Sequence, residues 1–160
     1  PERSPEEKTL DLIEGKKGIS YEKLFLPYLK GAKSIKIYDP YIRLQYQIYN
    51  LMSFCEILDP VKETLKVNLI TACDSYQETE LNDKLNELKK GLAQDQIEFE
   101  YTLEDNLHDR WIETDTGWRI ILGRGLDIFK KPDDKFTLGV MDQTKRKCKA
   151  TTITYTRLPG

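Results

Sequence analysis

A single histidine, His108, precedes Arg110 by two residues and Asp115 by seven. Alternate residues of a β-strand point to the same side, so a strand here would direct the His108 imidazole and the Arg110 guanidinium toward one bound group. An imidazole can act as nucleophile or acid toward a phosphate ester, and a guanidinium grips phosphate oxygens. On such a strand, the two side chains could converge on one phosphate. The alternative is that His108 is purely structural.

A second group of candidate anion ligands begins at Gly123-Arg124-Gly125. Two glycines around Arg124 would let backbone amides approach a phosphate, and a tight turn that needs positive φ is the alternative. The spacing is not G-x-G-x-x-G, so no dinucleotide site is predicted. Lys130 and Lys131 follow at the expected start of a loop, where they can bind lipid head groups or remain ordinary solvated side chains.

Helix and strand patterns alternate over the first part of the chain. Ser20 is a suitable N-cap for apolar residues at helical spacing over 21–29, which predicts a helix ending near Gly31. Residues 34–38 alternate polar and apolar side chains, which predicts a strand that Asp39-Pro40 ends.

The same alternation continues with a helix over 44–58 that closes at Asp59-Pro60, a strand over 65–71, a helix from about Thr79 to Leu92 and a strand over 97–101. Because strands and helices take turns, this part of the chain favours a parallel sheet with covering helices.

The pattern changes after residue 109. Two short strands over 110–114 and 118–122 flank Asp115-Thr116-Gly117, which is a hairpin signal. Residues 136–141 and 149–156 are predicted as the last two strands. The expected fold is therefore a single α/β domain with a mixed sheet covered by helices.

The chain has 160 residues, of which 39% are hydrophobic, as in an ordinary domain with a core. No apolar run approaches the ~18 residues of a membrane-spanning helix, so only peripheral contact with a bilayer is expected. We expect residues 1–15 to form a solvated linker and residues 16–160 to form the domain, as a piece of a longer protein.

The charge is unevenly distributed. Residues 118–160 carry a formal charge of +6 and the preceding residues −8, within a total of −2. Such asymmetry favours an anionic partner, namely lipid head groups or, less favoured, nucleic acid. The alternative is a salt-bridged surface on which the two parts neutralise each other.

The three cysteines, Cys55, Cys73 and Cys148, lie far apart in apolar periodic segments. Their odd number and spacing argue against a disulfide framework or a zinc site, and favour core thiols in a reducing compartment. We expect no metal and no cofactor.

The chain resembles a known family in several places. The spacing of His108, Arg110 and Asp115 is the H-x-K-x-x-x-x-D pattern of the phospholipase D superfamily, with arginine in the lysine position. Asp39-Pro40-Tyr41-Ile42-Arg43 and the stretch from Gly123 to Pro132 resemble the phospholipase-D-like C-terminal domain of MIT-domain-containing proteins, the partners of ESCRT-III in cytokinesis. The resemblance runs from about residue 19 to residue 155.

The resemblance implies a phospholipase-D-like domain that has lost catalysis, forms homodimers and binds acidic phospholipids, phosphoinositides among them. It implies a cytoplasmic, peripheral membrane location, with ESCRT-III proteins held only by an MIT domain outside this chain. By position, His108 and Arg110 are the remnant of the active-site motif. Arg124, Lys130 and Lys131 are the basic residues of the family's G-R-G-L-D block.

Catalysis in this superfamily uses one histidine to attack phosphorus and a second to protonate the leaving oxygen. This chain has one, which favours a non-catalytic module. One alternative is a phosphodiesterase or nuclease whose site forms across a homodimer from His108, Arg110 and Asp115. Another is a targeting or interaction domain fused to a prokaryotic ATPase.

Overall fold

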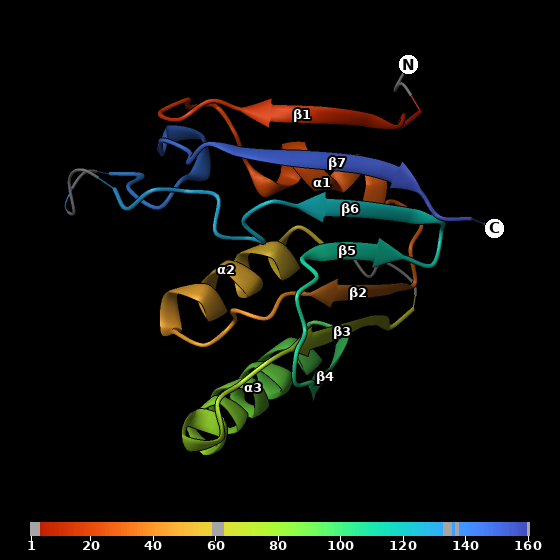
Figure 1. Cartoon of the computed structure of the whole chain (residues 1–160), viewed down its shortest axis with the longest axis vertical. Helices are drawn as coiled ribbons and strands as arrows, with labels where there is room; N and C mark the ends of the chain where they lie inside the picture. Colours follow the sequence, from red (N-terminus) through yellow and green to blue (C-terminus); the bar gives the residue numbers. More distant parts are fainter. Residues whose placement is uncertain (1–3, 59–62, 133–135, 137, 160) are drawn as a thin grey trace.

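The computed structural model describes residues 4–58, 63–132, 136 and 138–159. Within these residues, seven strands form one sheet in the order β1-β7-β6-β5-β2-β3-β4 (Figure 1). The strands are β1 (Lys8–Leu12), β2 (Ser34–Tyr38), β3 (Leu65–Thr71), β4 (Ile97–Leu103), β5 (Trp111–Thr114), β6 (Trp118–Leu122) and β7 (Thr151–Arg157). The helices are α1 (Tyr21–Leu29), α2 (Gln45–Glu56) and α3 (Glu78–Ala93), with short 3₁₀ turns η1 (Ser75–Gln77) and η2 (Gln143–Lys145).

The sheet is mixed, as the sequence predicts. Strands β2, β3 and β4 are parallel and are connected through α2 and α3, whereas all other neighbours are antiparallel. The carboxyl ends of β2, β3, β4 and β6 therefore meet the amino ends of β5 and β7 at one side of the sheet, which we call the carboxyl edge. The predicted hairpin is confirmed, because β5 and β6 pair on either side of Gly117, whose φ is +100°.

One face of the sheet carries the core. The register places Ile37 opposite Ile112 and Ile112 opposite Ile120, and all three are at most 1% exposed. On the other face, alternate residues of the parallel strands such as Lys36 and Lys66 are exposed. The helices therefore form a single layer on the core face.

Helix α1 begins where the sequence predicts. The Ser20 side chain accepts a hydrogen bond from the Lys23 amide at 3.1 Å and so caps the helix. The Tyr28 ring packs on the core face against Trp118 of β6 and Tyr155 of β7, with centroids 4.9 and 4.2 Å away. Through these contacts, α1 packs on the antiparallel half of the sheet.

Three sequence expectations need correction. Residues 8–12, assigned to a linker over 1–15, form β1, which pairs with β7 at the edge of the sheet. The described residues of the expected strand 136–141 lie in turns, and Thr137 lies outside the described residues. The second helix ends at Glu56, and the Asp59-Pro60 stop also lies outside them.

The three cysteines are free thiols. Cys55 and Cys148 are buried, as expected of core thiols, whereas Cys73 is only half-buried at the margin of the core. Burial raises the pKa of the Cys55 thiol to about 12, so this side chain behaves as a core residue rather than as a nucleophile.

Candidate functional site

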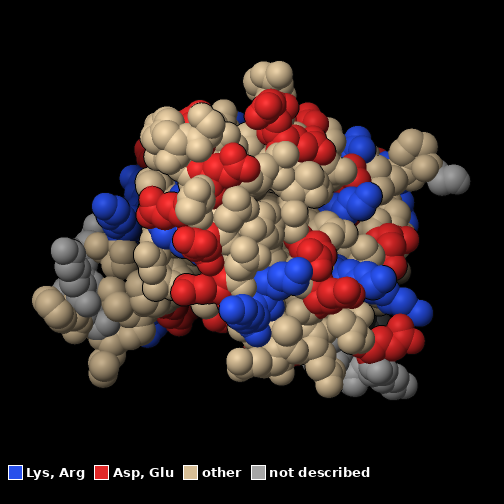
Figure 2. Space-filling view, turned by 90° about the horizontal axis from the view of Figure 1, so that it is seen from below, with Lys and Arg blue, Asp and Glu red and all other residues tan. Residues whose placement is uncertain are grey.

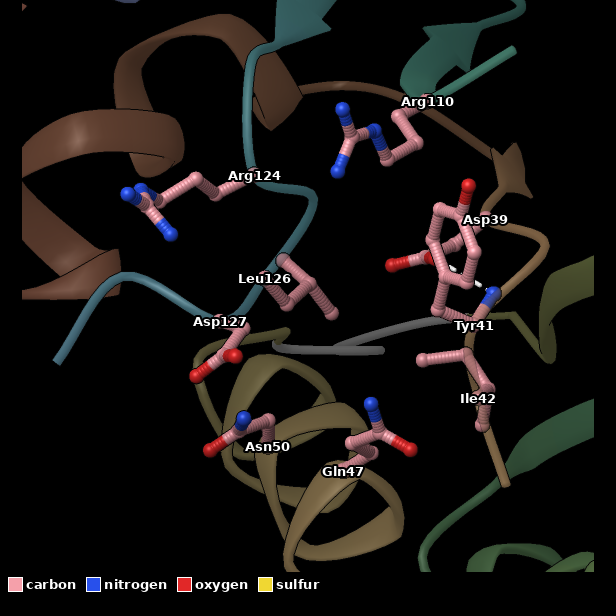
Figure 3. Close-up of a pocket in the computed structure, with 9 residues that line it drawn as sticks. All are labelled: Asp39, Tyr41, Ile42, Gln47, Asn50, Arg110, Arg124, Leu126 and Asp127. Carbon is pink, nitrogen blue, oxygen red and sulfur yellow. Dashed lines mark hydrogen bonds between the residues drawn. The ribbon is translucent and has the colours of Figure 1, made fainter. Parts of the chain in front are cut away.

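A pocket of about 220 Å³ lies at the carboxyl edge, between the β2–α2 connection, the start of β5 and the segment after β6 (Figure 3). Two arginines, two aspartates and two side-chain amides face it, together with three less polar residues. Its lining is Asp39, Tyr41, Ile42, Gln47, Asn50, Arg110, Arg124, Leu126 and Asp127.

Asp39 forms the inner wall. It follows β2 directly and is only 5% exposed. Its Oδ1 accepts a hydrogen bond from the Tyr41 amide at 2.9 Å. Burial raises the pKa of this carboxyl, while the amides of Tyr41 and Leu126 and the charge of Arg110 act in the opposite direction.

Gly125 lies against the Asp39 carboxylate, where a larger residue would not fit. Its φ is +60°, and a Cβ at this position would lie well under 3.0 Å from Oδ2 of Asp39. The turn at Gly123-Arg124-Gly125 thus needs glycine at its third position for two reasons, the left-handed backbone and the close carboxylate. The sequence left two roles open for these glycines, close approach of a phosphate or a tight turn with positive φ. Gly125 has the second role.

Arg110 is half-buried, and its guanidinium lies over the Tyr41 ring, 5.4 Å from the centroid. This contact is at cation–π distance and orients the side chain toward the pocket. Arg110 forms no ion pair with the residues that the structure describes. Its donors therefore remain available to an anion.

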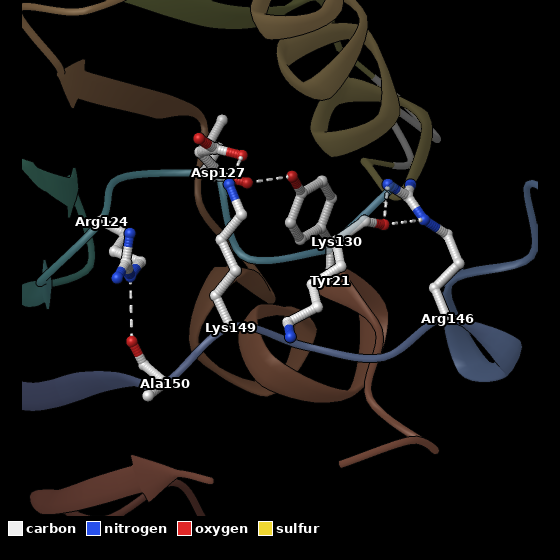
Figure 4. A network of polar contacts seen from close by, with 8 residues as sticks. Tyr21, Arg124, Asp127, Lys130, Arg146, Lys149 and Ala150 are labelled. Carbon is white, nitrogen blue, oxygen red and sulfur yellow. Dashed lines mark hydrogen bonds and ion pairs between the residues drawn. The ribbon is translucent and has the colours of Figure 1, made fainter. Parts of the chain in front are cut away.

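Arg124 lines the pocket from the segment after β6, and its side chain extends away from Arg110 (Figure 3). Its Nε donates a hydrogen bond to the Ala150 carbonyl at 2.9 Å, which fixes the side chain (Figure 4). Because Arg124 is exposed, its two terminal nitrogens can still donate to a ligand. Asp127 is neutralised from the other side, since Lys149 Nζ lies 2.8 Å from its Oδ1. The positive charges without an ion-pair partner at this site are thus Arg110 and Arg124, within the described part of the chain.

Gln47 and Asn50 come from the first two turns of α2. The Gln47 side chain accepts hydrogen bonds from the amides of Arg43 and Leu44 at 3.0 and 2.9 Å, and thereby caps the helix that carries it. Asn50, one turn later, presents an amide to the pocket. The site can therefore contact hydroxyl groups as well as an anion.

Residues 18–157 match the family model described as the phospholipase D-like domain at the C-terminus of MIT. This chain belongs to that family. It is also 39% identical over 151 residues to MIT domain-containing protein 1 of Mus musculus, covering 91% of this chain and 60% of the mouse protein. This chain thus spans about 60% of the length of the relative.

The histidine of the phospholipase D-like motif is not in the pocket. His108 is exposed and lies in the connection between β4 and β5, since β5 starts at Trp111. The expectation that a strand directs His108 and Arg110 to one phosphate is wrong. Of the two, only Arg110 lines the pocket.

Asp115 is also placed elsewhere. It lies in the β5–β6 turn, and its carboxylate accepts a hydrogen bond from the Lys33 amide at 3.0 Å, just before β2. Strand β5 separates it from Arg110, a distance of roughly 16 Å at ~3.3 Å per residue. Asp115 is therefore at the opposite edge of the sheet and supports the hairpin rather than the site.

Lys130 and Lys131 lie outside the pocket lining. Lys130 Nζ is 3.2 Å from Glu14, and its carbonyl accepts two hydrogen bonds from Arg146 at 3.1 and 2.8 Å (Figure 4). Lys131 is exposed. Neither lysine therefore lines the pocket together with Arg110 and Arg124.

Part of the charge asymmetry is cancelled by ion pairs. Arg119 and Lys130, from the basic part of the chain, pair with Glu113 and Glu14 from the acidic part. On the face formed by α3 and β4, acidic and basic side chains are interspersed (Figure 2), and Lys89 pairs with Glu100 at 2.9 Å. These ion pairs are those expected if the acidic and basic parts of the chain neutralise each other. Arg110 and Arg124 differ from the residues in these pairs, because they form no ion pair with the described residues.

The sequence motifs do not predict Asp39, Gln47 and Asn50 as site residues, although these residues line the pocket. The position of Asp39 directly after a buried strand could have identified it as a site residue. That strand, β2, has a parallel neighbour on one side and an antiparallel one on the other, and ligands of α/β sheets bind where the strand order changes direction.

Proposed function

We propose that this domain is a non-catalytic module that binds the phosphate groups of acidic phospholipids at the carboxyl-edge pocket and dimerises within a larger cytoplasmic protein. The observation that carries the proposal is the pair of arginines, Arg110 and Arg124, that line one pocket without ion-pair partners among the described residues. Among the described residues, the helices are too short or too polar to span a membrane. The proposed contact with membranes is peripheral.

The size and chemistry of the pocket favour a head group. Its volume of about 220 Å³ is below the ~300–1,000 Å³ of pockets that enclose whole drug-sized ligands. Two guanidinium groups provide forked donors that match phosphate oxygens. The side-chain amides of Gln47 and Asn50 can bond to hydroxyls of the same head group.

The relative's name supports the context of this module. Because the relative is an MIT domain-containing protein, we infer that an MIT domain lies outside this chain and that ESCRT-III proteins bind only through it. Dimerisation is supported by the sheet face that bears no helix layer, where the half-buried Tyr38 and Trp111 and the exposed Ile121 lie side by side in register. Such a face is suitable for an isologous contact.

The test is co-sedimentation of the chain with vesicles of phosphatidylcholine alone and with added phosphatidylserine or phosphoinositide. We expect binding only to the acidic vesicles. It should fall steeply as salt rises from about 0.1 M to about 0.5 M, because the screening length shrinks from ~10 Å to a few ångströms. Equal binding to neutral and acidic vesicles would contradict the proposal, as would a DNA or RNA oligonucleotide that outcompetes the acidic lipid.

Replacing His108 by alanine tests the proposal that the domain is not catalytic. A phosphohistidine route needs a nucleophilic imidazole and a second, protonated one, and loss of a positioned acid–base group commonly costs ~10²–10⁴ in rate. His108 is exposed and outside the pocket. We therefore expect His108→Ala to change neither vesicle binding nor the background hydrolysis of a generic phosphodiester. Hydrolysis that the wild-type chain performs and His108→Ala loses would instead identify a dimeric enzyme.

A further inference from the structure

Four large side chains with apolar surface are exposed around the start of α2. Tyr41, Leu44, Tyr46 and Tyr49 are 50, 56, 48 and 53% exposed. We call these four residues the α2 patch. Apolar surface gathered in one place marks a contact surface, because leaving it in water is unfavourable.

The α2 patch borders the pocket. Tyr41 lines the pocket itself. Tyr46 lies one helical turn before Asn50, which faces the pocket from α2 (Figure 3), and residues four apart are neighbours on the surface of a helix. Tyr49 is three residues from Tyr46 and is therefore its neighbour as well. The patch thus continues from the rim of the pocket along α2.

The segment that carries most of the patch is uncharged. Residues 44–55 contain no Asp, Glu, Lys or Arg, and they form the longest such run in a chain of which 32% of the residues are charged. The Gln45 side chain donates a hydrogen bond to the Tyr49 hydroxyl at 2.9 Å, so the polar end of this ring is held at the helix surface. Tyrosine has an apolar ring and a polar hydroxyl, and it is enriched at the boundary between a membrane and water.

The neighbouring charges favour an acidic lipid surface over a second copy of the chain. The Arg110 guanidinium lies over the Tyr41 ring, 5.4 Å from the centroid, so positive charge contacts the patch directly. In a two-fold contact through the patch, the arginines of both pockets would lie near each other and repel. Acidic head groups attract these arginines, and the layer just beneath them accepts tyrosine and leucine side chains.

We propose that Tyr41, Leu44, Tyr46 and Tyr49 lie in the interfacial layer of an acidic membrane while the pocket holds a head-group phosphate. The inference rests on the proposed function and adds an uncharged contribution to the affinity. Salt screens the attraction between charges, whereas it does not weaken the burial of apolar surface. Membrane binding should therefore retain a salt-resistant part that comes from the patch.

The experiment removes the two rings of the patch that lie on α2 and outside the pocket lining. Co-sedimentation compares Tyr46→Ser/Tyr49→Ser with the wild type on phosphatidylcholine–phosphatidylserine vesicles at about 0.1 M and about 0.5 M salt. Tyrosine and serine have similar helix propensities, so α2 should persist, and thermal melts check this. We expect roughly tenfold weaker binding at the lower salt and loss of the binding that the wild type retains at the higher salt.

Ile13→Ser is the matched control for the loss of exposed apolar surface. Ile13 is 73% exposed and follows β1, at the margin of the sheet remote from the strands that α2 connects. It should bind like the wild type at both salts. Tyr46→Trp/Tyr49→Trp is the conservative variant, and it should bind at least as tightly as the wild type, because tryptophan is also favoured at the membrane boundary.

A second readout reports insertion directly and does not depend on the double variants. In Tyr49→Trp, acidic vesicles should shift the emission of the new tryptophan to shorter wavelength. Brominated lipids should quench it beyond the signal of Trp111 and Trp118 in the wild type. Sedimentation equilibrium should show the same oligomer for the wild type and for Tyr46→Ser/Tyr49→Ser.

The outcomes separate the two proposals. Binding to acidic vesicles that Tyr46→Ser/Tyr49→Ser leaves unchanged overturns the role of the patch and leaves the head-group pocket standing. The same holds if Tyr49→Trp binds without shift or quenching, or if Ile13→Ser loses as much affinity as the double variant. A double variant that changes from dimer to monomer also overturns it, and assigns the patch to a second copy. Wild type that binds no acidic vesicle at either salt overturns both proposals.

Discussion

Gly125→Ala is expected to lower the free energy of unfolding by roughly 2–4 kcal/mol. The left-handed backbone accounts for ~1–2 kcal/mol of this loss, because φ at Gly125 is +60°. The remainder comes from the new Cβ, which would overlap Oδ2 of the buried Asp39. Urea denaturation of the wild type and the variant measures the difference.

Gly31→Ala is the matched control for this prediction. Gly31 has φ +79°, and an added Cβ would meet nothing within 4 Å. It should therefore show only the backbone part, ~1–2 kcal/mol.

The overlap itself is isolated by adding Asp39→Ala to Gly125→Ala, which removes the carboxylate. We expect a favourable coupling energy of at least about 1 kcal/mol in this double-mutant cycle. Additive single effects, or equal losses in Gly125→Ala and Gly31→Ala, would show that Gly125 does not support Asp39 as described.

Arg110→Gln is expected to weaken binding to acidic vesicles by roughly 10- to 100-fold without lowering stability by more than about 1 kcal/mol. A charge-assisted hydrogen bond contributes ~1.5–3 kcal/mol, and Arg110 forms no ion pair among the described residues that the change would break. Glutamine keeps the length of the stem and part of the contact with Tyr41. Co-sedimentation and thermal melts provide the two readouts.

Arg157→Gln is the control for charge. It removes the same formal charge from the end of β7, at the edge of the sheet opposite the pocket, where the exposed Arg157 side chain lies over the Trp118 ring, 4.2 Å from the centroid, and does not line the pocket. We expect it to bind acidic vesicles almost as well as the wild type. If both variants lose affinity equally, the chain responds to net charge, and the pocket has no special role.

The secondary structure is largely readable from the sequence, because its signals are local. Ser20 and the apolar spacing of residues 21–29 are sufficient to place α1, and Gly117 between two apolar runs is sufficient for the β5–β6 hairpin. Strand β1 is not readable in this way. Its residues are mostly exposed and polar, and it is a strand only because β7 offers an edge more than a hundred residues later in the chain.

The apolar run 136–141 shows the opposite error. Its composition is that of a buried strand, but no neighbouring strand pairs with its described residues, which lie in turns around Gly139. Hydrophobic pattern indicates that a segment must be covered and does not say by what.

Local signals in the sequence are sufficient for the family, for most of the helices and strands, and for the presence of one histidine where superfamily catalysis uses two, because motifs and periodicity are properties of neighbouring residues. Which residues line the pocket depends on the tertiary structure. Arg110 joins Asp39 because β5 starts beside the end of β2, while two residues earlier His108 is still outside the sheet, and Asp115 is carried to the far edge by the length of β5. Strand register and connection geometry set these positions, and they depend on pairings between distant segments that local patterns do not encode.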